Sequence, residues 1–234
     1  MTAATNITDP SRRADVLTAS GIIGLILLML LMVMHHPVAR QTDAAGVINS
    51  IARQASADRF VHGTLAAAMT VMTSLMLGFA MRLGLARPHV LLGAVASALA
   101  LVLISLAVLL DGFVAPALAL RCTTIGKDCV EQTEALLRYG GLQIEFLTRL
   151  ALLALASATA LWAGDLILRR NGARIAGILG LCSAAVQFGL LTFGGERLNV
   201  QNISLILTAQ VIWYASVGTI IVLRQGPYAS TDQG

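Results

Sequence analysis

Histidine and carboxylate side chains recur near the ends of the long apolar segments of this chain. Imidazole and carboxylate groups together are donors that bind copper, iron or zinc in proteins, and ionisable groups at a membrane indicate a functional role by default. Counting about 1.5 Å per residue along each predicted helix places five of these side chains at one level, the outer face of the membrane. We therefore predict a metal or haem site there, with ligands drawn from His35, His36, His62, Asp111 and Glu145.

The same residues also have an ordinary structural interpretation. The histidines can lie solvated in the headgroup region, with only their apolar parts in contact with lipid, and Asp111 can end a helix beside Gly112. Glu145 has a partner for an ion pair in Arg149, four residues further on and in the favourable order. Because no HxxxH, ExxH or CxxC spacing accompanies these residues, both interpretations stay open.

Other polar residues inside the apolar segments are expected to join helices. Gln143, Gln187 and Gln210 lie in three different segments, where side-chain amides hydrogen-bond between helices or line a cavity. Asp165 lies close to several arginines in the sequence, and we predict that it pairs with them. His89 lies at the inner ends of the helices, about a membrane thickness from the outer group, so it cannot join that group.

Two of the three cysteines share one short polar loop. Cys122 and Cys129 are separated by a sequence that contains Gly126, which permits a turn. We predict a disulfide between them, which requires an oxidising compartment and so places this loop outside the cytoplasm. Two unpaired thiols are the alternative, and a metal site lacks the CxxC spacing and a second pair. Cys182 lies in an apolar segment and is predicted to be a small core residue.

The fold class follows from composition. The 234 residues are 57% hydrophobic and 12% charged, whereas soluble domains carry about 25% charged residues. Six runs of about 20 apolar residues each match a hydrocarbon core of about 30 Å. We predict an all-α polytopic protein of the lipid bilayer, a six-transmembrane-helix bundle over residues 16–224. Residues 1–15 are predicted to be a cytoplasmic segment and 225–234 a disordered cytoplasmic tail. The predicted helices are 16–34, 59–83, 89–111, 134–167, 174–193 and 203–223.

Two segments between the predicted helices carry a pattern of their own. Within the polar connection 38–58, apolar residues recur at helical spacing, which predicts an amphipathic helix in the membrane interface; an ordinary polar loop is the alternative. Asp58 is then the expected N-cap of the following helix. Segment 113–121 is apolar but contains Pro116, so we expect a re-entrant or interfacial piece.

Charge distribution sets the expected orientation. The net charge is +4, but Lys and Arg form no run and sit mostly at helix ends, which argues against a nucleic-acid partner. The short connections beginning at Arg82 and Arg169 are rich in arginine, and Arg12 and Arg13 precede the first apolar run. This density predicts that both termini are cytoplasmic. The preference for arginine over lysine, with abundant alanine and leucine, points to the inner membrane of a bacterium.

Three classes of function stay open. The first is a membrane protein that holds a metal or haem at its outer face. The second is a small transporter or channel component, with Gln187, Gln210, Glu145 and Arg149 along its path. The third is an accessory subunit without chemistry of its own, which binds a membrane-protein partner or forms a homo-oligomer. No phosphate loop or nucleophile elbow marks the chain as an enzyme.

Overall fold

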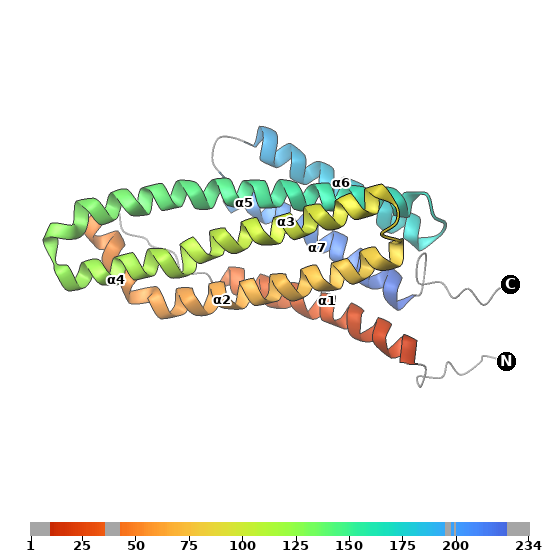
Figure 1. Cartoon of the computed structure of the whole chain (residues 1–234), viewed down its shortest axis with the longest axis horizontal. Coiled ribbons are helices and arrows are strands. Elements are labelled where there is room, and N and C mark those ends of the chain that lie inside the picture. Colours follow the sequence, from red (N-terminus) through yellow and green to blue (C-terminus); the bar gives the residue numbers. More distant parts are fainter. Residues whose placement is uncertain (1–9, 36–42, 195–197, 199, 224–234) are drawn as a thin grey trace.

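All regular structure in the described part of the chain is helical, with no strand (Figure 1). The structure is a computed structural model that describes residues 10–35, 43–194, 198 and 200–223. Six helical segments among these residues are long and apolar enough to cross a membrane, which confirms the predicted six-helix membrane bundle. The elements are α1 (Pro10–Met34), α2 (Ala44–Leu83), α3 (Pro88–Leu109), the π-helical turn η1 (Leu110–Val114), α4 (Ala115–Ile125), the 3₁₀ turn η2 (Lys127–Cys129), α5 (Val130–Ile167), α6 (Gly172–Phe193) and α7 (Val200–Val222).

The spans fall into two classes of length. Helices α1, α6 and α7 contain 25, 22 and 23 residues, or about 33–38 Å, which is close to one hydrocarbon core. Helix α2 contains 40 residues, α5 contains 38, and the continuous helical path over 88–125 also contains 38. These three reach about 57–60 Å. About half of each must therefore extend beyond the hydrocarbon layer.

The main hydrophobic core shows at which end the long helices pack against the short ones. It contains buried residues from all six spans. On the long helices these residues lie within 72–83, 88–94 and 158–166, and we call these ends the core ends. At its centre Phe79 meets Trp162 and Trp213 edge to face, with ring centroids 6.4 Å apart in each pair. The opposite halves of the long helices extend past α1, α6 and α7 at the left of Figure 1.

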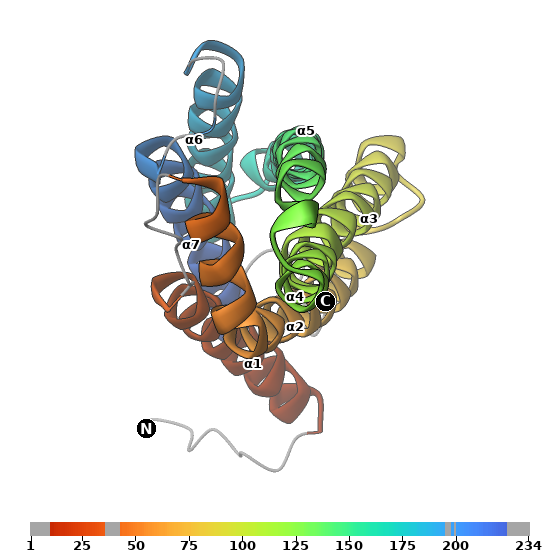
Figure 2. The ribbon, with the colours of Figure 1, turned by 90° about the vertical axis from the view of Figure 1, so that its left-hand side faces the viewer.

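Counting residues locates the far edge of the hydrocarbon layer on the long helices. About 20 residues from the core ends of α2, α3 and α5 lead to Gly63, Val108 and Leu147. Everything beyond that level projects out of the layer on one side. We call this part the projecting segment, and it comprises residues 44–62 and 109–146. Seen from this end, α5 lies between α3 and α6 (Figure 2).

The amphipathic stretch before the second span is helical, but it is the first part of α2 rather than a separate interfacial helix. The helix begins after Asp43, whose Oδ2 accepts from the amide of Gly46 at 2.8 Å. The predicted N-cap at Asp58 is therefore wrong, because that residue lies inside α2. Ile48 and Ala55 are 3% and 4% exposed. Their apolar face is covered by protein, which removes the need for a lipid surface.

The third span does not stop at Asp111, and the predicted re-entrant piece over 113–121 is wrong. The chain widens into the π turn η1, where the amide of Ala115 donates to the carbonyl of Leu110, and then continues as α4. Pro116 lacks an amide hydrogen, and its ring crowds the carbonyl four residues earlier. A π turn immediately before a proline relieves that conflict without ending the helix.

The cysteine loop closes the tip of the projecting segment. Cys122 near the end of α4 and Cys129, the last residue of η2, lie at disulfide-bonding distance, with Cα atoms 5.6 Å apart. Gly126 makes the turn with φ +99°, a conformation that only glycine adopts readily. Both cysteines pack with Ile48 and Ala119 in a small second core. The tip therefore holds all three projecting helices together.

We expect thiol counting to detect this pair. In protein isolated from membranes and denatured without reductant, iodoacetamide should alkylate one cysteine, Cys182. This residue is unpaired, and it is exposed rather than in the core as predicted. After reduction, intact mass spectrometry should count all three. The variant Cys182→Ser serves as the control and should show no label before reduction and two after it. Three labels in the unreduced protein would contradict the pairing.

Candidate functional site

Two of the five predicted ligands meet at the base of the projecting segment. Nε2 of His62, on α2, lies 3.1 Å from Oδ2 of Asp111, in η1. Nδ1 of His62 lies 2.9 Å from the carbonyl oxygen of Asp58, one turn earlier. The histidine is buried, at 4% exposed, whereas the side chain of Asp111 is 43% exposed. The pair therefore joins a fixed imidazole to a carboxyl group that other molecules can reach.

The hydrogen-bond pattern fixes the proton content of this pair. A carbonyl oxygen only accepts, so Nδ1 of His62 carries a hydrogen and donates it to Asp58. Nε2 then contacts Asp111 either as an imidazolium beside a carboxylate or as a neutral ring accepting from a carboxylic acid. In both states one proton is held between the two side chains. The arrangement can exchange that proton with a polar group that approaches Asp111.

A glycine permits the close approach of η1 to α2. A Cβ added at Gly112 would overlap Cβ of His62 and lie 2.5 Å from its Cγ. The backbone fixes the position of Cβ of His62, so this atom cannot rotate away. Glycine next to Asp111 thus lets the π turn press against α2 and brings the carboxyl group onto the ring.

A cavity of about 580 Å³ opens beside this pair, between the first turns of α2, the η1–α4 region and α5. Asp111 forms part of its wall, and Glu134 and Arg138 line it as an ion pair with Nη2 and Oε1 2.6 Å apart. At Gly140 and Gly141, which also line it, an added Cβ would meet only open space. Most of the remaining wall is apolar and includes Val47, Ile51, Val114, Leu118, Leu137 and Ile144.

The other predicted ligands do not converge on the pair. His35 is exposed, and its Nδ1 lies 2.9 Å from the carbonyl oxygen of Leu31. Glu145 faces Nη2 of Arg149 at 3.7 Å and accepts from the amide of Leu198 at 3.1 Å. His36 lies outside the described residues. Among the residues that the structure describes, no three His, Cys, Asp or Glu side chains are grouped as a metal site requires.

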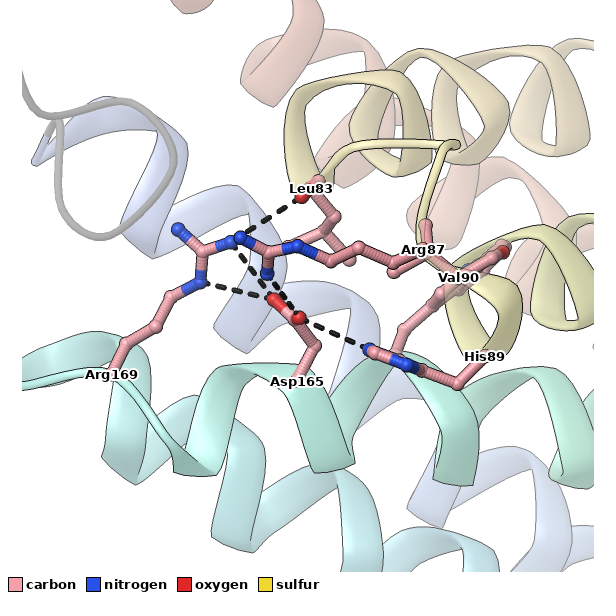
Figure 3. Close-up of polar contacts among 7 residues, drawn as sticks. Leu83, Arg87, His89, Val90, Asp165 and Arg169 are labelled. Atoms are coloured by element: carbon pink, nitrogen blue, oxygen red, sulfur yellow. Dashed lines mark hydrogen bonds and ion pairs between the residues drawn. The ribbon is translucent and has the colours of Figure 1, made fainter.

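A second polar cluster lies at the core ends of the helices, around Asp165 of α5 (Figure 3). This carboxylate is 2% exposed and accepts from Arg87 at 2.5 Å, from His89 at 3.2 Å and from Arg169 at 2.8 and 3.1 Å. Arg169 also reaches the carbonyl of Leu83, with the donor and acceptor 3.5 Å apart. The predicted arginine pairing of Asp165 is confirmed. The cluster ties the end of α2 and the start of α3 to α5, so its evident role is structural.

Sequence reasoning missed three features of these sites. It did not pair His89 with Asp165, because contacts between distant helix ends have no local signal. It did not foresee the cavity, which needs three helices that are distant in sequence. The sequence did contain a sign of the projecting segment. Apolar residues at helical spacing over 47–55 lie just before the apolar run that begins near 59, which is consistent with one long helix through both.

Comparisons of the chain with protein-family profiles, with curated proteins and with solved structures find no match. No residue role is carried over from a relative. The function has to be argued from the geometry of the residues themselves.

The close approach of η1 to α2 predicts that Gly112→Ala destabilises the protein. The added methyl group would overlap His62, and relieving such overpacking costs about 1–3 kcal/mol. Thermal unfolding in detergent should show a lower Tm. The matched control is Gly63→Ala, where the new Cβ has Phe113 at 3.8 Å as its nearest neighbour. An equal Tm for the two variants would count against the proposed contact.

The buried carboxylate of the inner cluster predicts a second stability difference. Replacing Asp165 by Asn should lower the free energy of unfolding by about 1–3 kcal/mol, because charged partners lose a buried acceptor. Glu134→Gln breaks an exposed pair on the same helix and should cost less than about 1 kcal/mol. Parallel unfolding curves measure both, and a larger loss for Glu134→Gln would refute this ranking.

Proposed function

We propose that this integral membrane protein binds a small apolar or amphipathic molecule in the cavity of its projecting segment. One observation carries the proposal: a mostly apolar cavity of about 580 Å³ lies on the part of the helices that leaves the hydrocarbon layer. Apolar surface facing water is unfavourable, and a contiguous area of it marks a binding site. The volume lies within the usual range of small-molecule sites, about 300–1,000 Å³.

The His62–Asp111 pair supplies the polar end of the proposed site. A ligand with a hydroxyl, amine or carbonyl group can meet Asp111 in the cavity wall while its apolar part contacts leucine and valine side chains. The proton held between His62 and Asp111 allows the pair to donate to the ligand or to accept from it. Binding and proton exchange are thus coupled at one carboxyl group.

We propose that the projecting segment is extracytoplasmic, with both termini in the cytoplasm of a bacterial cell. The cysteine pair at its tip supports this side, because disulfides persist in oxidising compartments. Arginines gather at the opposite ends of the helices, in the connections after α2 and α5, as the positive-inside rule requires of the cytoplasmic face.

Three other predicted functions have weaker support. A metal or haem stays a prediction: His62 and Asp111 offer two donors, while Glu145 is engaged with Arg149 and Leu198. A channel would need polar groups along a path, yet Gln187 donates to Gln210 at 2.7 Å in a buried contact between α6 and α7. An accessory role with a protein partner or in a homo-oligomer also stays a prediction.

Filling the cavity should abolish binding. In Gly141→Leu the new side chain enters space that contains no atom within 4 Å of the Cβ, so the fold should tolerate it while the cavity shrinks. Labelling of the cavity wall by a photoreactive diazirine analogue of decanol, mapped by peptide mass spectrometry, should fall about tenfold, a loss of about 1.4 kcal/mol of binding free energy.

Gly164→Leu is the matched control for this experiment. It lies on the same helix, its Cβ also meets open space, and it is remote from the cavity. Both changes replace glycine by a better helix former, so they should affect helix stability alike. The proposal fails if, in the wild-type protein, peptides of the cavity wall are labelled no more than peptides of the lipid-facing surface. It also fails if both variants lose labelling equally.

A further inference from the structure

A groove between α3 and α5 leads from the lipid-facing surface toward the cavity. It is lined by Leu106, Leu109, Leu110, Leu142, Phe146 and Leu147, together with Tyr139 and Gln143. Two of these side chains are exposed: Phe146 is 65% exposed and Leu142 53%. The end of the groove nearest the main core, at Leu106 and Leu147, lies at the far edge of the hydrocarbon layer.

The groove and the cavity share part of their walls. Leu110, Tyr139 and Gln143 line both of them. Tyr139 precedes Leu147 by eight residues, which places it about 12 Å beyond the hydrocarbon layer. The apolar wall of the groove therefore reaches from the edge of the hydrocarbon layer to residues that also line the cavity.

We propose that the ligand is a bilayer lipid, drawn outward so that its acyl chain lies in this groove and its polar end reaches the cavity. The inference rests on the proposed function of the cavity and names its substrate class. At Leu106 and Leu147 the groove opens toward the lipid, since α3 and α5 are membrane spans. A lipid chain is the apolar occupant that this surface meets without crossing water.

The polar end of such a lipid would find groups of both signs. Arg138 and Glu134 line the cavity as an ion pair, and Arg138 and Glu145 line the adjoining opening beside Gly141. A zwitterionic phospholipid carries one phosphate and one ammonium group, which complement a guanidinium and a carboxylate. The charges on the wall thus suit a neutral head group better than an isolated anion or cation.

Quenching by brominated lipid tests whether an acyl chain rises to Tyr139. The variant Tyr139→Trp is reconstituted in phosphatidylcholine brominated on its acyl chains and in the unbrominated lipid. The parent protein, with Trp162 and Trp213 only, supplies the emission to subtract. Most of the emission that the new tryptophan adds should be lost in the brominated bilayer, although the residue lies beyond the hydrocarbon layer.

The matched control is Ala117→Trp on α4. This position is exposed, lies at a similar height and lines neither the groove nor the cavity, so its added emission should be unchanged. Phe146→Trp, at the edge of the layer within the groove, should be quenched in any case and verifies the probe. If Tyr139→Trp does not fold, Leu142→Trp, one turn closer to the membrane, replaces it.

Two results would overturn the lipid proposal. No quenching at position 139, with quenching at 146, means that the chain stays in the bilayer. Equal quenching at 139 and 117 means that the whole projecting segment lies in lipid. The first result leaves the cavity as a site, because decanol labelling that depends on Gly141 would then indicate a ligand that arrives from water. The second result would also remove the premise of the proposed function, which places the cavity outside the hydrocarbon layer.

Discussion

The mismatch between helix length and bilayer thickness governs this molecule. Three of its spans are about twice as long as the hydrocarbon layer, and their core ends are fixed by packing against three short spans. Their other halves have to leave the layer together on one side. The polar contacts, the second small core and the cavity then follow, because helices that emerge side by side bury their apolar faces against one another.

Polar groups mark the two ends of the hydrocarbon layer with different chemistry. At the core end, Asp165 accepts hydrogen bonds from Arg87, His89 and Arg169 in one compact cluster. At the other end, His62 is buried while Asp111 remains open to the cavity. The two sites also differ in their surroundings, because Asp111 lines the cavity of the projecting segment, whereas Arg87, His89 and Asp165 do not.

Much of the architecture could be predicted because each span carries its own apolar run, and length alone identifies it. The ends of the helices were harder to predict. Asp58 is a residue type that favours a helix N-cap, and Pro116 is one that favours the end of a helix. Tertiary packing prevailed over both local preferences. Ile48 is buried against Cys122 and Cys129, so α2 continues through Asp58. Gly112 allows the π turn to pack against His62, so the third span continues past Pro116. The level of the candidate ligands could be counted from sequence, but which of them touch depends on helix rotation, which no local pattern encodes.

The π turn at Leu110–Val114 also acts as a one-residue phase shift in the third span. A π turn contains one residue more than an α-helical turn, so every position after it is rotated by about 100° relative to an uninterrupted helix. Without that extra residue, Cys122 would point away from Ile48 and Cys129. The direction in which Cys122 points toward Cys129 thus depends on a single inserted residue. That residue lies about two helical turns earlier in the chain, at the edge of the membrane.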